Sequence, residues 1–147
     1  DPSADTGRHQ FTYSLFPHAG RWGSRTQAAA YKLNDPVIVF ESGSSTAQAS
    51  QCKLIEPVVS VDAEHVIIET IKQAENGDGI IVRMFESRQQ RGEVTVSAGF
   101  KLSQAYRTNL LEAPIETLDV VGPTVTLNVK PFEIVTLKLM PAKAQGS

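Results

Sequence analysis

Residues 64–85 read EHVIIETIKQAENGDGIIVRMF, and this stretch decides the fold. Two runs rich in β-branched side chains, 64–71 and 79–85, flank the turn dipeptides Asn76-Gly77 and Asp78-Gly79. Glycine accepts the positive φ that tight hairpin turns need, and β-branched side chains suit a pleated strand. A phosphate-binding loop is the alternative, but no Lys-Ser or Lys-Thr pair follows these glycines. The stretch therefore predicts a β-hairpin.

Further strands are predicted on both sides of this hairpin. Alternation of apolar and polar residues predicts half-buried strands at 9–16, 94–98 and 125–129. In the first of these, Phe11, Tyr13 and Leu15 share one face, and we expect that face to look inward.

Two other segments are less regular. In the run 132–139, Phe132 and Ile134 would lie on one face of a strand, and the apolar residues 135, 137 and 139 would lie on the other. This strand is therefore either buried on both faces or bulged near Ile134. Segment 101–111 mixes helical and strand spacing, and we favour extended chain there.

One short helix is predicted at 27–33, with Thr26 as its cap and the sequence Asn34-Asp35-Pro36 as its end. A short strand, 37–40, should follow. The Ser-rich stretch 42–50 offers almost nothing apolar to bury and predicts a mobile loop.

These elements together predict an all-β fold, an antiparallel two-sheet sandwich with one short helix. A chain of 147 residues should bury roughly 68–70% of its unfolded surface, enough for a single core. We therefore expect residues 1–147 to form one domain. The chain opens at Asp1 rather than Met, which favours a piece of a longer protein.

The charge balance bears on possible partners. Fourteen basic residues oppose sixteen acidic ones, for a formal net charge of -2, and no basic stripe is present. This disfavours nucleic acid as a partner, because binding a phosphate backbone needs an excess of positive charge. No apolar run approaches the roughly 20 residues of a membrane span. Cys52 is the single cysteine, which excludes an intramolecular disulfide and favours a small core side chain.

Few residues in the sequence suggest chemistry. Arg8, His9, His18 and Trp22 surround the first predicted strand and could bind a polar ligand or a sugar ring, although a solvated strand end explains them as well. The three histidines, at 9, 18 and 65, lack local partners, so no metal site is predicted.

The remaining candidates have structural explanations. Glu112, Glu116 and Asp119 are expected in a solvated loop rather than as a hydrolytic carboxylate pair. The Ser44-Ser45 pair lacks the flanking pattern of a nucleophile. From the residues alone, the chain is an all-β domain without visible catalytic groups.

Residues 7–20, GRHQFTYSLFPHAG, resemble a stretch in the C-terminal half of glycoside hydrolase family 38 α-mannosidases. Later segments resemble the same region in the same order: AYKLN at 30–34, the hairpin 66–86, TNLLE at 108–112 and PFEIVTL at 131–137. The resemblance covers nearly the whole chain and implies a C-terminal β-sandwich of a longer cytoplasmic α-mannosidase.

The family's reaction is retaining hydrolysis of α-mannosides, with an Asp nucleophile, a second acid, and a zinc ion that grips sugar hydroxyls. By this resemblance those groups belong to an upstream catalytic domain, so this chain should hold no cofactor and be catalytically silent alone. Its partners would be the upstream domains and, through the full enzyme, mannose-containing glycans, but no nucleic acid or membrane. Arg8, His18 and Trp22 are the candidates for shaping the substrate cleft.

Two other functions stay open. A carbohydrate-binding module would show exposed aromatic rings along one face, whereas Phe11 and Tyr13 are predicted to look inward. An immunoglobulin-like interaction domain would instead carry an exposed apolar patch for a partner protein.

Overall fold

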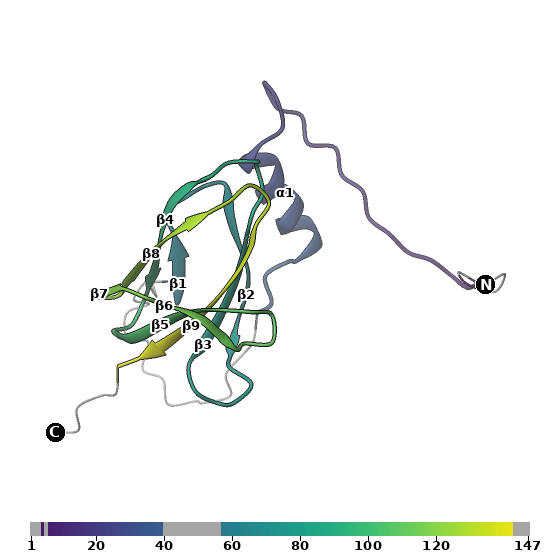
Figure 1. The fold of residues 1–147 in the computed structure, drawn as a ribbon. Helices are drawn as coiled ribbons and strands as arrows, with labels where there is room; N and C mark the ends of the chain where they lie inside the picture. Colours follow the sequence, from purple (N-terminus) through teal and green to yellow (C-terminus); the bar gives the residue numbers. More distant parts are fainter. Residues whose placement is uncertain (1–3, 5, 40–56, 143–147) are drawn as a thin grey trace, which may run out of the picture. The chain divides into compact units, whose positions relative to one another are not determined.

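A computed structural model describes residue 4 and residues 6–39 and 57–142 of the chain (Figure 1). The chain divides into two compact units, Asp1–Glu41 and Ser42–Ser147. The first unit contains one helix, and the second contains every strand found in the described residues. Each unit is described by itself below. No helix in the described parts is long and apolar enough to cross a bilayer.

The second unit is a sandwich of two antiparallel sheets, as predicted. The four-stranded sheet has the order β1-β4-β8-β7. Its strands are β1 (Val59–Val61), β4 (Gly92–Ala98), β8 (Thr124–Val129) and β7 (Val120–Val121). The five-stranded sheet has the order β2-β3-β9-β5-β6. Its strands are β2 (Val66–Gln73), β3 (Ile80–Glu86), β9 (Ile134–Pro141), β5 (Leu102–Thr108) and β6 (Pro114–Leu118).

The predicted hairpin is confirmed as β2 and β3, paired from Val66 opposite Glu86 to Gln73 opposite Ile80. Its turn uses both expected glycines. Gly77 has a φ of 75° and its amide donates to the carbonyl of Ala74 at 2.8 Å. Gly79 has a φ of 95°, and a Cβ there would lie 2.9 Å from the carbonyl oxygen of Leu139. Only glycine therefore fits where the turn passes β9.

The core lies between the two sheets. It is built from alternate residues of the facing strands, among them Val82, Met84, Val94, Val125, Leu137 and Leu139, each at most 1% exposed. The predicted strands at 94–98 and 125–129 are confirmed as β4 and β8. The extended chain favoured for 101–111 is confirmed over β5, but residues 110 and 111 form a turn.

Strand β9 lies between β3 and β5 and is buried on both faces. Val135, Leu137 and Leu139 belong to the core, and the intervening Thr136 and Lys138 are 3% and 8% exposed. Full burial, rather than a bulge near Ile134, therefore explains the mixed parity of this run. Its register against β3 is continuous from Ile134 to Leu139.

The helix of the first unit, α1 (Ser24–Asn34), confirms the one predicted helix but begins earlier. Its N-cap is Gly23, so the prediction that Thr26 caps it is wrong. Thr26 is the third helical residue, and its hydroxyl accepts from the Gly23 amide at 3.4 Å. A polar side chain at the third helical position can accept a hydrogen bond from the backbone amide of the N-cap residue, as in a capping box.

Two predicted strands of the first unit are wrong. Residues 9–16 and 37–39 form no strand, and Phe11, Tyr13 and Leu15 are 80%, 87% and 89% exposed. Alternation shows which face of a strand would be buried, but a strand also needs a neighbour for its backbone groups. Phe40, the predicted loop 42–50 and Cys52 lie outside the described residues. The single domain expected over 1–147 stays a prediction.

Replacement of Leu137 by Ala tests the position of the core. Leu137 is fully buried, whereas Leu111 is 87% exposed. We expect Leu137→Ala to lower the free energy of unfolding by about 2–5 kcal/mol, because it removes buried methyl groups and leaves a cavity. Leu111→Ala, the same chemical change, should lower it by less than about 0.5 kcal/mol. Urea denaturation followed by circular dichroism measures both, and equal losses would contradict this core.

Candidate functional site

The three residues proposed to shape a substrate cleft all lie in the first unit. Arg8 is exposed, and Trp22 is 66% exposed. The imidazole of His18 is within 3.3 Å of the carbonyl oxygen of Ala19, and its ring packs against Phe16 with centroids 5.8 Å apart. These contacts of His18 are to sequence neighbours. A role for the three residues in sugar binding stays a prediction.

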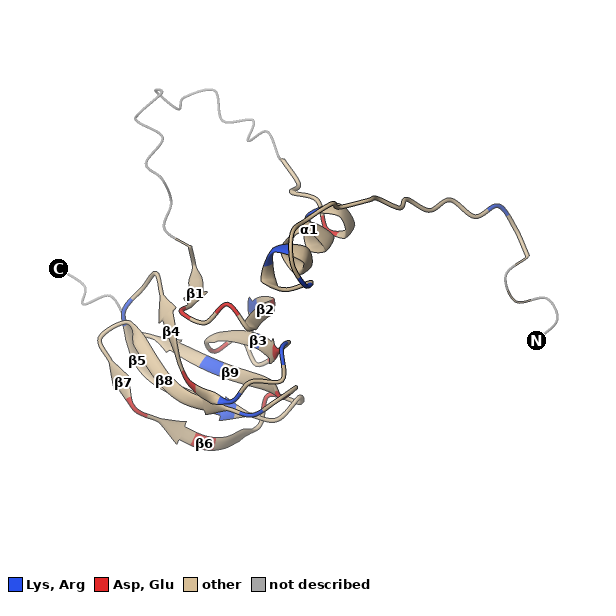
Figure 2. Cartoon of the chain, turned by 90° about the horizontal axis from the view of Figure 1, so that it is seen from above, with Lys and Arg blue, Asp and Glu red and all other residues tan. Residues whose placement is uncertain are grey.

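A cluster of charged side chains lies on the five-stranded sheet, on the face turned away from the core. Lys72 of β2 pairs with Glu112 at 2.8 Å and also with Glu75. The amide of Glu75 donates to the other oxygen of Glu112 at 2.8 Å. Figure 2 shows Lys and Arg in blue and Asp and Glu in red along the chain.

Lys72 and Glu112 shift each other's pKa. The hydrogen bond to Glu112, then that to Glu75, raises the pKa of Lys72. The hydrogen bond from Lys72, then that from the Glu75 amide, lowers the pKa of Glu112. Both groups are thereby held in their charged forms. Glu112 lies in a loop, as predicted, but its side chain is largely covered, at 10% exposed. Glu116 and Asp119 are exposed, but Glu116 lies within β6.

Glu112 belongs to the loop between β5 and β6, residues 109–113, which we call the crossing loop. It crosses the outer face of the sheet, because Glu112 reaches Lys72 on β2 although the loop starts from β5. A guanidinium nitrogen of Arg83 on β3 donates to the carbonyl of Leu110 at 3.3 Å. Ile81, between Lys72 and Lys138 in register, is 0% exposed. The loop therefore helps to cover the outer face.

Lys138 is the buried cation beneath this cluster. It is 8% exposed, and its ammonium donates to the side-chain oxygen of Asn76 in the hairpin turn at 3.1 Å. Its charge also contributes to the lowered pKa of Glu112. A buried ammonium is costly unless it is paired and hydrogen-bonded, and the turn and the crossing loop supply these partners.

Glu86 is a second buried carboxylate, 2% exposed at the end of β3. It accepts backbone hydrogen bonds from Phe132 at 2.8 Å and Arg88 at 2.7 Å, and others from Gln89 and Gln90. Burial is the largest single effect on its pKa and would raise it. The four backbone donors together outweigh burial and lower the pKa of Glu86 below its ordinary value.

This carboxylate fastens the β3–β4 and β8–β9 turns to the end of the sandwich. Gln89 and Phe132, in these two turns, have positive φ values of 59° and 57°. The sequence analysis missed this group. The signal was available, since Glu86 continues the core parity of Val82 and Met84 and so places a carboxylate at a core position.

The state of these carboxylates limits the chemistry that they can perform. A general acid needs a carboxyl group whose pKa is raised toward the working pH. Glu86 and Glu112 both have a lowered pKa and are occupied by backbone amides or by Lys72. They hold loops rather than donate protons. Among residues 4, 6–39 and 57–142, no group of three or more His, Cys, Asp or Glu side chains could bind a metal ion.

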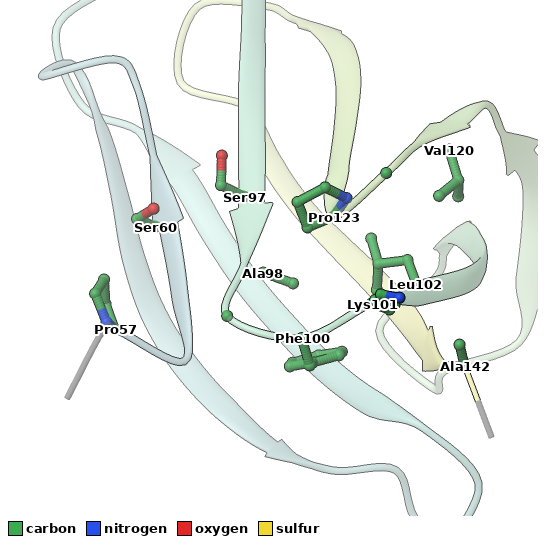
Figure 3. A pocket seen from close by; sticks show the side chains of 12 residues that line it. Pro57, Ser60, Ser97, Ala98, Phe100, Lys101, Leu102, Val120, Pro123 and Ala142 are labelled. Carbon is green, nitrogen blue, oxygen red and sulfur yellow. The ribbon is translucent and has the colours of Figure 1, made fainter. Parts of the chain in front are cut away.

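A hollow of about 720 Å³ lies at one end of the sandwich (Figure 3). The side chains around it are mostly apolar and come from the ends of both sheets, including Pro57, Phe100, Leu102, Val120 and Pro123. Among the described residues that line it, Lys101 is the one charged side chain. This lining suits apolar contact rather than acid-base catalysis.

Comparisons with known proteins agree with this architecture. Residues 65–137 match the family described as "Glycosyl hydrolases family 38 C-terminal beta sandwich domain". Over 146 residues the chain is 30% identical to human "Alpha-mannosidase 2C1", covering 95% of this chain and 14% of that protein. Over 88 residues it is 35% identical to "Alpha-mannosidase G" of Dictyostelium discoideum, covering 59% of this chain and 8% of that protein. The chain thus spans a small part of these relatives.

Replacement of Glu86 by Gln tests the carboxylate that fastens the turns. The amide of Gln keeps one acceptor but turns an N–H₂ group toward backbone donors. We expect Glu86→Gln to lower the free energy of unfolding by about 1–3 kcal/mol at neutral pH, because buried amides lose their acceptor. Glu116→Gln, on an exposed carboxylate, is the control and should change it little.

The difference in unfolding free energy between wild type and Glu86→Gln should depend on pH. Because the pKa of Glu86 is lower in the folded protein, its stabilisation is complete above the ordinary value of 4.5 and is lost as pH falls through the folded pKa. The gap between wild type and Glu86→Gln should therefore narrow on acidification below this value. Urea unfolding at several pH values measures it, and a gap that widens toward acid would contradict the assignment.

Proposed function

This chain belongs to the family of glycosyl hydrolase family 38 C-terminal β-sandwich domains, and from that premise we propose that it is a supporting, non-catalytic domain of an α-mannosidase. The match from residue 65 to residue 137 carries the proposal, because it runs from the start of the hairpin to the middle of β9 and so includes most of the sandwich. The names of the relatives support the same activity for the parent protein.

The chemistry of the sandwich supports the non-catalytic part of the proposal. Glu86 and Glu112, the described carboxylates with shifted pKa values, stabilise turns and loops in their ionised forms. A retaining glycosidase instead needs one carboxylate free to attack the sugar and one acid free to protonate the leaving oxygen. Those groups would lie in the remainder of the parent protein.

The parent would hydrolyse terminal α-mannosides of oligosaccharides with retention, with zinc gripping the sugar hydroxyls. By the resemblance to family 38, zinc would be bound by the upstream catalytic domain. Mannose-containing glycans and the upstream domains are the proposed partners. We place the parent in the cytoplasm, a compartment that a chain with one cysteine tolerates.

A carbohydrate-binding module is the second candidate, because one observation favours it. Phe11, Tyr13 and Trp22 are exposed rather than turned inward. The rings of Phe11 and Tyr13 lie 6.4 Å apart at their centroids and are tilted by 35°. Exposed aromatic faces can stack on sugar rings. The prediction that Phe11 and Tyr13 look inward, which argued against this function, is wrong.

Hydrolysis assays test the leading proposal. The full-length parent protein should hydrolyse an aryl α-mannoside, and dialysis against a chelator should remove this activity until zinc is restored. An aryl β-mannoside is the control substrate and should not be cleaved. The 147-residue chain at the same molar concentration should give no turnover. Turnover by this chain alone, or cleavage of only the β-mannoside by the parent, would contradict the proposal.

Substitution of Trp22 tests the cleft. In the full-length enzyme we expect Trp22→Ala to raise KM by about tenfold with little change in kcat, the pattern of lost substrate binding. Arg8→Ala and His18→Ala should act in the same direction, and Arg25→Ala, on an exposed residue of α1, is the control. Unchanged KM in all three would remove them from the cleft. If mannose shifts the Trp22 indole NMR signal of the isolated chain, the binding module is favoured instead.

A further inference from the structure

The crossing loop presents two exposed leucines on a firmly held backbone. Leu110 is 61% exposed and Leu111 is 87% exposed, and we call this pair the leucine tip. We propose that the leucine tip is a docking surface for an upstream part of the same polypeptide. The inference rests on the proposed function, because it takes the chain to be one domain of a longer enzyme.

The first argument is the internal order of the loop. The side-chain oxygen of Asn109 accepts from the amides of Leu111 at 2.9 Å and Ala113 at 3.0 Å. The backbone of Asn109 donates to the Ala113 carbonyl and accepts from the Glu112 amide, both at 3.0 Å. Glu112 has a φ of 65°, in the left-handed region that a residue with a side chain seldom adopts. These hydrogen bonds order the backbone that carries the two leucines.

The second argument is the attachment of the loop to the sheet. Glu112 is fixed to β2 and the hairpin turn by Lys72 and by the Glu75 amide, and Arg83 holds the Leu110 carbonyl. A loop needed only to cover Ile81 could expose polar side chains at its tip. Here an ordered loop exposes two large apolar ones instead. Such preorganisation lowers the entropy lost when a partner binds.

The third argument is the apolar surroundings of the tip. Ile134 is 62% exposed and lies on the outer face of β9, two residues before Thr136. Thr136 is opposite Arg83 in the sheet, and Arg83 donates to the carbonyl of Leu110. Ile115, 68% exposed, follows the loop at the start of β6. The crossing loop and the two strands beside it, β6 and β9, therefore each expose large apolar side chains. Single exposed apolar residues are normal, whereas apolar patches mark interaction sites.

The occupant follows from the size of the chain and from local charge. This chain spans 14% of human alpha-mannosidase 2C1, so most of such a protein lies outside it and is available as a partner in cis. The two side chains of the tip are uncharged, and nearby Lys72 and Glu112 are paired with each other. An apolar surface of a neighbouring domain fits the tip. Interfaces between domains of one chain bury about 600–1,500 Å², so residues around the tip would take part.

Thiol labelling of the full-length enzyme tests this docking. Leu111→Cys replaces the tip, and Val121→Cys replaces a residue that is 75% exposed in β7 of the other sheet. Mass spectrometry of peptides reads the label at each position apart from the native thiols. We expect the thiol at 111 to react at least about tenfold more slowly than that at 121 in the native enzyme, because labelling requires the domains to open. In denaturant the two rates should be equal.

A second measurement identifies what covers the tip. A photo-crosslinking benzoylphenylalanine at position 111 of the full-length enzyme should link to a residue upstream of this chain, within one polypeptide. Equal native labelling rates at 111 and 121, protection that is lost on dilution, or crosslinks only to a second copy or to this chain itself would each overturn the proposal. An enzyme without α-mannosidase activity but with a protected tip would refute the proposed function and leave the docking surface standing.

Discussion

Burial of β9 on both faces is the constraint on which the rest of the sandwich depends. The strand lies between β3 and β5, and its inner residues Val135, Leu137 and Leu139 form the core with the four-stranded sheet. Its outer residues Thr136 and Lys138 are buried as well, although nothing in a two-sheet sandwich covers that face. The crossing loop and the hairpin turn must therefore supply the cover and the hydrogen-bond partners that a buried ammonium requires.

The need to cover and hydrogen-bond buried groups also explains the roles of the acidic side chains. The ion pair with Lys72 holds Glu112, and with it the crossing loop, over the outer face of the sheet. Glu86, at the end of β3, holds the β3–β4 and β8–β9 turns by accepting backbone hydrogen bonds. Both groups are ionised because their partners favour the charged form. Carboxylates used in this way stabilise the geometry of loops. This arrangement is typical of side chains that stabilise loops, and it differs from the free acid and base that a hydrolytic centre needs.

Sequence patterns were reliable where partners are close in the chain and misleading where they are distant. The hairpin was predictable because both strands and the turn glycines lie within residues 64–86. The doubly buried β9 could be stated only as one of two alternatives, since parity does not reveal what lies on either side. Of the candidate site, the alternation at 82, 84 and 86 could have revealed Glu86, whereas the pairing of Lys72 with Glu112 joins residues 40 positions apart.

The amino-acid sequence by itself determined the all-β class, the hairpin, the alternating core faces and the resemblance to family 38, because these depend on local periodicity and on ordered motifs. Tertiary structure alone decided which alternating segments become strands. Phe11, Tyr13 and Leu15 have the pattern of a strand but remain exposed, whereas Val135, Leu137 and Leu139 are buried. The physical reason is that a strand needs a neighbour for its backbone hydrogen bonds and a surface for its apolar face, and both come from residues distant in the chain.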